Sequence, residues 1–452
     1  MNLKNFKNYF IVAALATLAL SSCKSKFDDE DPIVVKQEVV LEGQITSTQT
    51  LDANKTYLLR GYVRVMNNAS LTIPAGTLLK GEKNTKGALI IEKGGKIFAN
   101  GTATSPIVFT SDQTVNSRNI GDWSGVVICG KAPVNTADGT GTYEGGVLGA
   151  GIAEYGGTVA NDNSGIFKYV RIEFAGIAIQ TDKEINSLTL CGVGNGTQID
   201  HVQVSFGGDD GFEFFGGTVN ATHLIAYRCT DDDFDFDNGY NGKLQYGISI
   251  KDPNVADLIG TSRGIEDENK GTPFPSSFIS RPVISNFTFI GPSTSSLTFH
   301  GANVHFGLNS KMVLANSIIV NARTVAIEAN TEVPAGFIKD GSSIISDNIV
   351  FGNTANYGLK DVTVAFANVA AFDAFALTKG NTAVASLSAA GFTSTSLDNP
   401  VLTISSSSAA NNKAKFTGDL ATGFSVTTFA GAMGTTDWTT GWASWSPKTN
   451  VY

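Results

Sequence analysis

The chain is poor in the residues and patterns that mark disulfide-rich, collagen-like and membrane-spanning proteins. Its 452 residues include 4 cysteines and 12 prolines, too few for a disulfide scaffold or a proline-rich stalk. Cys129, Cys191 and Cys229 lie in apolar or turn settings without a CxxC or Cys-His pair, so we expect buried thiols. After residue 22 no apolar run is long enough to span a bilayer. Helical periodicity is also scarce, and we expect one short helix, at 361–376.

Positive charge is in deficit. The chain has 32 Lys and Arg against 41 Asp and Glu, a formal net charge of −9. Removal of an N-terminal segment containing Lys4 and Lys7 makes the balance more negative still. Because an acidic surface repels phosphate, we exclude nucleic acid as a partner.

The N-terminus reads as an export signal. Lys4 and Lys7 precede a ten-residue apolar core, Ile11–Leu20, which is too short to cross a bilayer. The following Leu20-Ser21-Ser22-Cys23 resembles a bacterial lipobox, in which Cys23 is lipidated. We therefore expect residues 1–22 to be a lipoprotein signal peptide; an ordinary signal peptide with an incidental cysteine is the alternative.

Residues 23–40 read as a flexible, disordered linker. Lys24 follows the cysteine, and the run Asp28-Asp29-Glu30-Asp31 resembles the export tags of Bacteroidota lipoproteins. This resemblance implies an outer-membrane protein that faces the extracellular side. A solvated linker without an export role is the alternative.

The rest of the chain is dominated by short β-type runs separated by Gly, Asn and Asp. Early examples are Tyr62–Met66, Ser70–Ile73, Ala88–Glu92, Ile107–Thr110 and Trp123–Ile128. A phrase built from a small or polar residue, a β-run and a glycine recurs every 22 to 32 residues or so, which fits one turn of a β-solenoid. We therefore predict an all-β chain: a single right-handed parallel β-helix over 41–452, with an atypical C-terminal cap at about 355–452.

One repeat is especially clear. Residues 201–217 align with 223–239 at a shift of 22, which places His201 on His223, Asp209 on Asp231, Asp210 on Asp232, Phe212 on Phe234 and Phe214 on Phe236. Strand alternation then predicts an inward ladder of phenylalanines and an outward acidic ladder of Glu213, Asp233 and Asp235. The two histidines are expected to stack as packing residues.

Three segments carry a family resemblance: 87–112 (GALIIEKGGKIFANGTATSPIVFTSD), 121–135 (GDWSGVVICGKAPVN) and the closing 435–452 (TTDWTTGWASWSPKTNVY). Together with the acidic repeat, they resemble surface lipoproteins of Bacteroidota with a right-handed parallel β-helix of the pectin-lyase-like superfold. The resemblance covers about residues 40–330 and the last twenty. The family is largely uncharacterised, so the resemblance implies fold and location more than activity. Trp438, Trp442 and Trp445 are expected to pack the end of the solenoid.

The acidic repeat is the candidate metal site. Stacked carboxylates repel unless protons or a hard cation neutralise them, and Ca²⁺ takes six to eight oxygen ligands. The candidate ligands are Asp209, Asp210, Glu213, Asp231, Asp232, Asp233 and Asp235, with Asp237 next to them. The alternatives are that the aspartates of the turns cap backbone N–H groups, or that they act directly in catalysis.

Weak catalytic candidates adjoin this cluster. Polysaccharide lyases of this fold use Asp-bound Ca²⁺ beside a Lys or Arg base, which here implies Asp210, Asp232 and Lys243, with Arg228, Lys251 and Arg263 as other cations. Lys243 is also explained as a surface charge. Gly208-Asp209-Asp210 and Phe299-His300-Gly301 are faintly similar to the GDD and GHG elements of polygalacturonase-type hydrolases, but they are too far apart in the chain.

Three functions remain open at this stage. The first is a monomeric surface module that binds an extracellular polysaccharide or a surface protein, with Ca²⁺ stiffening the acidic coils. The second is a calcium-dependent polysaccharide lyase or a β-helical glycoside hydrolase. The third is a structural coat protein without a small ligand. Because no complete catalytic set is present, we favour the first.

Overall fold

The computed structural model describes residues 36–146, 148–180, 183–270, 278–352 and 354–452. The expected signal peptide and Cys23 lie outside this range, as does most of the expected linker. The first strand, β1 (Gln37–Ile45), begins inside the segment that we expected to be linker, so residues 37–40 already belong to the folded domain. Residues 37–452 form one unit. None of the helices formed by the described residues is both long enough and apolar enough to cross a membrane.

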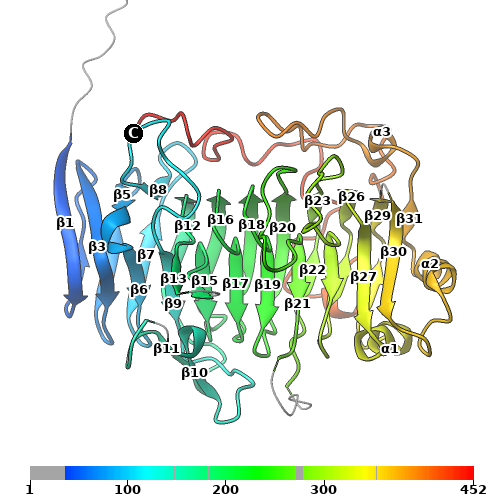
Figure 1. The fold of residues 1–452 in the computed structure, drawn as a ribbon, viewed down its shortest axis with the longest axis horizontal. Coiled ribbons are helices and arrows are strands. Elements are labelled where there is room, and N and C mark those ends of the chain that lie inside the picture. Colours follow the sequence, from blue (N-terminus) through cyan, green and yellow to red (C-terminus); the bar gives the residue numbers. More distant parts are fainter. Residues whose placement is uncertain (1–35, 147, 181–182, 271–277, 353) are drawn as a thin grey trace, which may run out of the picture. The chain divides into compact units, whose positions relative to one another are not determined.

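The domain is a right-handed parallel β-helix in which each coil contributes strands to three parallel sheets (Figure 1). Within a coil the chain passes through sheet 1, then sheet 2, then sheet 3, and each strand pairs with the corresponding strand of the next coil. The right hand is the one that parallel strand crossovers adopt. The all-β, single-solenoid prediction is confirmed.

The sheets are composed as follows. Sheet 1 contains β2 (Gln49–Thr50), β4 (Ser70–Ile73), β7 (Lys96–Asn100), the first parts of β12 (Gly165–Glu173), β16 (Gln198–Ser205), β18 (Ala221–Tyr227) and β20 (Lys243–Ile250), then β22 (Val283–Ser285), β25 (Val313–Ala315) and β28 (Ile344–Ser346). Sheet 2 contains most of β1, the first part of β3 (Lys55–Val65), β5 (Leu78–Gly81), β8 (Ile107–Ser111), the second parts of β12, β16, β18 and β20, then β23 (Thr288–Ile290), β26 (Ile318–Ala322), β29 (Ile349–Gly352) and β31 (Thr382–Ala383). Sheet 3 contains the end of β3, then β6 (Ala88–Ile91), β9 (Gly125–Cys129), β15 (Leu188–Cys191), β17 (Phe212–Phe215), β19 (Phe234–Asp237), β21 (Ile265–Asp267), β24 (Val304–Phe306), β27 (Val325–Thr331) and β30 (Ala355–Asp361).

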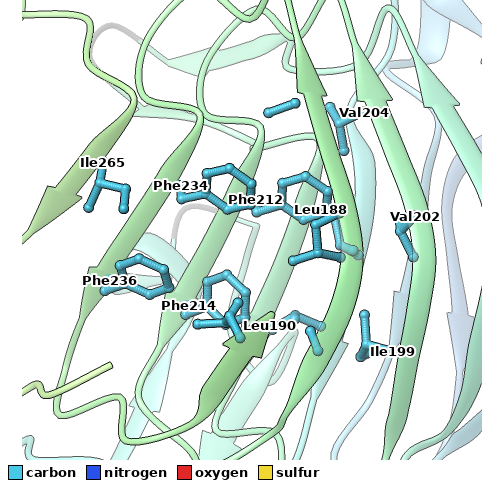
Figure 2. Close-up of a cluster of buried hydrophobic side chains, with 14 of the residues drawn as sticks. Leu188, Leu190, Ile199, Val202, Val204, Phe212, Phe214, Phe234, Phe236 and Ile265 are labelled. Atoms are coloured by element: carbon cyan, nitrogen blue, oxygen red, sulfur yellow. The ribbon is translucent and has the colours of Figure 1, made fainter. Parts of the chain in front are cut away.

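The predicted repeat is aligned in space as it is in sequence. In sheet 3, Phe212 pairs with Phe234 and Phe214 with Phe236. Their ring centroids are 5.1 Å and 5.0 Å apart, and all four rings are buried. Figure 2 shows one of these rows continuing to aliphatic side chains on neighbouring strands, with Ile265 to the left and Leu188 to the right of Phe234 and Phe212. The inward ladder is therefore confirmed.

Sheet 2 is apolar on both faces, because a C-terminal segment covers its outer side. In strand β18, Leu224 points into the solenoid while Ile225 and Tyr227 point outward, yet all three are buried. The cover is residues 392–452, here called the C-terminal strap, which returns along the solenoid toward its first coils (Figure 1, orange to red). A strand buried on both faces is expected to be a continuous hydrophobic run, as Ile318, Ile319 and Val320 of β26 are.

Side-chain amides fasten the strap to the coils. Each amide donates to one strap backbone carbonyl and accepts from the N–H of the same residue, with all distances between 2.7 and 3.0 Å. The pairs are Gln203 with Ser444, Gln245 with Ser425, and Asn316 with Lys415. The strap thus pairs with late coils first and early coils last, so it runs antiparallel to the stacking direction.

Two expectations about the C-terminal part need correction. Trp438 and Trp442 lie over the side of the solenoid, where they contact the ring of His201, and they do not pack its end. The end is instead closed by α2 (Val369–Thr378), whose Phe372 contacts Tyr357 of the last coil. Helix α2 overlaps the predicted helix at 361–376 but starts later, because Asn368 caps it.

Most of the remaining elements of the described residues lie in the connections between strands: β10 (Thr140–Thr142) with β11 (Glu154–Gly156), β13 (Ala178–Gln180) with β14 (Lys183–Glu184), α1 (Glu332–Asp340), η1 (Lys83–Thr85) and η2 (Tyr143–Gly145). Helix α3 (Leu387–Ala390) follows the last strand, and η3 (Gly418–Leu420) lies in the strap. Periodicity did not reveal α1, a single nine-residue helix. The three cysteines are buried free thiols, as predicted, and Cys129 pairs in register with Cys191.

The phenylalanine ladder leads to a stability prediction. Phe234→Ala removes a buried ring that contacts Phe212 and Phe287, so we expect a loss of about 3–5 kcal/mol in the free energy of unfolding. Val426→Ala, at a residue that is 79% exposed, is the control and should change stability by less than about 0.5 kcal/mol. Denaturation followed by circular dichroism measures both; equal stability of the two variants would contradict the ladder.

Candidate functional site

Carboxylates from three successive coils converge on one pocket. The pocket lies where the chain turns from sheet 2 into sheet 3, and its volume is about 290 Å³. Among the described residues its walls carry nine carboxylates and one ammonium. The lining residues are Glu144, Asn186, Gly208, Asp209, Asp210, Glu213, Asp231, Asp232, Asp235, Asp257, Ile259, Gly260, Glu266 and Lys270. We call this the acidic pocket.

Two of the predicted ligands also hold the turns of the coils together. Asp210 Oδ1 accepts the backbone N–H of Asp232 at 2.8 Å, and Asp232 Oδ1 accepts the N–H of Arg263 one coil further on. One coil earlier, Asn186 Oδ1 accepts the N–H of Asp210 at 3.0 Å. The turn-capping alternative is therefore correct for Asp210 and Asp232, each of which uses one oxygen for this purpose and leaves the other toward the pocket wall.

The arrangement of oxygens fits a hard cation. Asp209, Asp210 and Asp231 each offer an oxygen within 4.8 Å of the others, and so do Asp210, Glu213 and Asp235. Oxygens that share one Ca²⁺ at 2.3–2.6 Å lie at most about 5 Å apart. Because Asp210 belongs to both groups, five carboxylates from two coils lie within reach of one ion or two adjacent ions.

Asp235 is a buried member of the pocket with a carboxylate oxygen that lacks a donor. It is 5% exposed, and its Oδ1 has no hydrogen-bond partner among the described residues. Its neighbour in register, Glu213, is equally buried and accepts from the side-chain amide of Asn186. A buried carboxylate oxygen without a donor is unfavourable, since it has lost water and gained nothing in exchange. A cation at this position would supply the missing partner.

Burial and mutual repulsion raise the pKa values of these groups. Burial raises the pKa of Asp210 well above its usual value, and the charge of Asp209 raises it further. Burial likewise raises the pKa of Glu213, with Asp235 as the next contributor. Burial raises the pKa of Asp231 to about 6. Without a counter-ion, part of the pocket therefore stays protonated near neutral pH.

Asp233 does not belong to this site, contrary to the sequence prediction. Its carboxylate points into the solenoid, where Oδ1 lies 3.2 Å from Lys251 Nζ and Oδ2 accepts from the hydroxyl of Ser249 at 2.5 Å. Asp233 precedes the FxF strand in the turn, so the strand alternation that we applied to it does not hold there. Asp237 lies on sheet 3 beyond the pocket walls, with Lys270 Nζ 3.9 Å from its Oδ2.

Lys243 is also misplaced by the sequence prediction. It begins the sheet 1 part of β20, and its Nζ donates to the carbonyl of Thr422 in the C-terminal strap at 2.6 Å. It is therefore remote from the acidic pocket and not a catalytic candidate. The cations beside the pocket are Arg263, whose Nη1 is 3.6 Å from Asp232, and Lys270. Burial opposes the charge of Lys270, but Asp235 and Asp237 outweigh it and raise the pKa of the ammonium.

The two histidine-containing predictions have different outcomes. The rings of His201 and His223 stack with centroids 4.1 Å apart, as expected. They lie at the corner between sheets 1 and 2, away from the acidic pocket at the corner between sheets 2 and 3. His300 is buried beside Ser262 and is not among the residues of the pocket wall. The resemblance of 208–210 and 299–301 to hydrolase elements therefore does not produce a joint site.

Sequence reasoning missed several pocket residues. Glu266 pairs in register with Asp235, but residues 251–264 lengthen this coil and shift the repeat from 22 to 31 residues, which hid the alignment. Glu144 reaches the wall from the connection between β10 and β11, and Asn186 from the coil before the repeat. Extending the register by one coil in each direction would have found Glu266 and Asn186.

Comparison with known proteins agrees with this architecture. A family model described as "Pectate-lyase like beta helix domain" matches residues 43–443. No curated protein matches the chain, and neither does any solved structure. The matched region includes every coil that forms the acidic pocket. The chain therefore belongs to the pectate-lyase-like β-helix domain family.

Proposed function

We propose that this protein is a cell-surface lipoprotein that binds acidic polysaccharide through Ca²⁺ held in the acidic pocket. The observation that carries the proposal is Asp235, a carboxylate that is 5% exposed and has an oxygen without a donor among the described residues. It faces Glu213, Asp210 and Glu266 in a wall of like charge. A cation supplies what this wall lacks.

The donor set favours Ca²⁺ over other ions. The five clustered side chains offer only carboxylate oxygens, which suit hard cations, and the site is irregular enough for the adaptable coordination of Ca²⁺. Asp210, Glu213 and Asp235 would hold the ion from one side, with Asp209 and Asp231 beside them. A Ca²⁺ ion in this position would supply positive charge and would take the carboxylate of a uronic acid as a further ligand.

The substrate class follows from family and charge. Membership of a pectate-lyase-like family supports a polysaccharide-related role. A pocket with nine carboxylates repels an acidic sugar by itself. A bound cation would give the acidic sugar a positive centre to coordinate within this pocket. Binding of the glycan therefore depends on the ion, and the ion links the chain to its ligand.

The cations beside the pocket favour binding over cleavage. A lyase requires a base that is deprotonated at the working pH. Neighbouring carboxylates raise the pKa of Lys270, which keeps this ammonium protonated. Arg263 is paired with Asp232 and Glu266, and Lys243 is bound to the strap. None of these three cations is therefore suited to abstract a proton from a sugar.

The location of the protein completes the proposal. Cys23 carries the lipid that anchors the chain to the outer membrane, and the β-helix projects from it on the extracellular side as a monomer. An acidic extracellular polysaccharide is then the accessible partner. The apolar core at 11–20 and the small residues before Cys23 support this placement.

The pocket predicts that the stability of the metal-free protein falls as pH rises. A carboxyl group whose pKa is raised by folding binds its proton more tightly in the folded state. Its contribution to stability is therefore full at a pH below the pKa of the unfolded chain, and it is lost as the pH rises through the pKa of the folded state. Because the folded-state pKa of Asp231 is about 6, the contribution of this group is lost over about pH 4 to 6. In EDTA, Tm should be several degrees lower at pH 8 than at pH 5, and Ca²⁺ should restore most of this difference. Calorimetry that shows a higher Tm at pH 8 in EDTA would contradict the proposal.

Calcium binding itself is tested at Asp235. Asp235→Asn retains the shape but removes the charge that lacks a donor, so we expect at least a tenfold weaker Kd for Ca²⁺ by isothermal titration calorimetry, since one lost carboxylate ligand is worth about 1.4 kcal/mol or more. Asp361→Asn makes the same charge change at an exposed position and should bind Ca²⁺ like the unmodified protein. Identical titrations for all three proteins would show that the pocket is not the site.

Glycan binding is tested with the same variants. Polygalacturonate and alginate should retard the unmodified protein in affinity electrophoresis with Ca²⁺, and should not do so in EDTA or with Asp235→Asn. A neutral glucan serves as the control polymer. Release of unsaturated products from either polyuronate would show that the protein is a lyase and not a binding module. Unchanged mobility in every gel would show that acidic polysaccharide is not the ligand.

The lipid anchor predicts a separate outcome. Cys23→Ser removes the only thiol available for acylation near the signal. Expressed in a bacterium supplied with labelled palmitate, the unmodified chain should incorporate label and sediment with membranes, because acyl chains partition strongly into the bilayer. The variant should do neither. Label on the Cys23→Ser chain would refute lipidation at this residue.

A further inference from the structure

A row of four stacked rings lies at the corner between sheets 1 and 2. Tyr169, His201, His223 and Tyr246 occupy equivalent positions on successive coils, with centroid separations of 4.3, 4.1 and 4.9 Å. Trp438 of the C-terminal strap meets His223 edge-on at 5.0 Å. The row is thus built from the coil repeat and partly walled by the strap.

The backbone at this corner does not require aromatic residues. All four ring-bearing residues adopt a positive φ, between 48° and 62°. Later coils place Asn286 and Asn316 in the same conformation, which asparagine tolerates far better than tyrosine. A bulky residue with positive φ is strained and is retained where it has another role. Tyr246 therefore raises the question of what its ring contacts.

The aromatic row ends at Tyr246, beside a cavity. Its ring stacks on His223 on one side, and no described aromatic residue contacts the other side. The next coil contributes Asn286, whose side-chain amide is directed to the strap carbonyl of Phe429 at 2.8 Å. The cavity measures about 500 Å³, within the range of ligand sites. Its walls are His223, Tyr246, Asn411, Ser425, Thr428, Phe429, Ala432, Met433, Gly434, Thr435, Thr436 and Trp438. We call this the aromatic groove.

The chemistry of the aromatic groove is opposite to that of the acidic pocket. Its walls contain no carboxylate, lysine or arginine among the described residues. Thr428, Thr435 and Thr436 are exposed, and their hydroxyls make no hydrogen bond to a described residue. Flat rings with hydroxyl groups around them suit a ligand that has an apolar ring face and a polar edge.

A metal ion is a poor occupant of this corner. Asp200 accepts from Nδ1 of both histidines, at 2.8 and 2.9 Å. The same carboxylate is paired with the ammonium of Lys168 at 2.9 Å. The carboxylate of Asp200 therefore already accepts from two imidazole rings and one ammonium, and the charge of Lys168 repels a metal cation. The histidines act as rungs of the row that supports Tyr246.

We propose that the aromatic groove is a second glycan site, which binds a neutral pyranose against the half-buried rings of Tyr246 and Trp438 that line it. The hydroxyl groups of the sugar bind the threonines of the rim. This goes beyond the cation-dependent site, because the ligand is uncharged and no ion is required. The two sites lie at different corners of the coils and bind different classes of sugar.

The experiment uses the full chain in EDTA, which removes any cation-dependent binding. Tetrasaccharides of glucose, mannose, galactose and xylose are titrated while the fluorescence of tryptophan is followed, since Trp438 lines the groove. We expect at least one to bind and to alter the emission. Tyr246→Ala should weaken its Kd about tenfold, whereas Tyr246→Phe should retain it. Tyr169→Ala, at the far end of the row, is the matched control and should bind normally.

A second variant protects the test against loss of folding. Thr428→Arg introduces a long side chain at an exposed rim position, so it should abolish binding while Tm stays within a few degrees of the unmodified protein. Failure of all four tetrasaccharides to bind, or an affinity of Tyr246→Ala and Thr428→Arg equal to that of the unmodified protein, would overturn the proposal. Neither result affects Ca²⁺-dependent binding of polyuronates, which is measured separately.

Discussion

In-register stacking of coils is the constraint on which the rest of the molecule depends. Parallel strands about 4.8 Å apart place each side chain directly over the corresponding side chain of the next coil. Where these side chains are apolar, as Phe212 and Phe234 are, stacking gives a continuous core. Where they are charged, as Glu213, Asp235 and Glu266 are, the same geometry forces repulsion. Core and candidate site are thus two faces of sheet 3 and follow from one register.

The repulsion is too large to be left uncompensated. Two carboxylates 4.8 Å apart repel by about 3.5 kcal/mol at an effective dielectric of 20, and several such pairs meet in the pocket. Arg263 and Lys270 offset part of this from the third coil. Protonation offsets another part, since burial raises the pKa of Asp210 and Glu213. Burial raises the pKa of Asp235 as well, and the charge of Lys270 opposes this. Because Oδ1 of Asp235 still accepts no hydrogen bond from a described residue, a bound cation is the simplest completion of the site.

The sequence predicted the register of the 22-residue repeat, but it did not predict the coils and turns where this register changes. The 22-residue shift predicted the pairing of 201–217 with 223–239 because no insertion separates these coils. It failed at Glu266, since residues 251–264 lengthen the next coil, and at Asp233, which lies in a turn where strand alternation does not apply. Lys243 was misplaced because proximity in sequence to an acidic coil says nothing about which of three sheets a residue joins. The course of the strap could not be predicted, because residues 392–452 contain almost no regular strand or helix and so show no sequence periodicity.

The strap also explains where a solenoid of this kind can acquire a second site. The strap covers the outer face of sheet 2 and side chains fill the interior of the solenoid, so variable chemistry is left to the uncovered outer faces, the corners and the edges of the strap. At the sheet 2–3 corner, turns of changing length bring carboxylates together. At the sheet 1–2 corner, one residue of positive φ per coil projects outward, and the strap passes beside it. A row of projecting rings next to a polar, uncharged segment is therefore a direct product of the coil repeat and its cover, and it needs no separate binding domain.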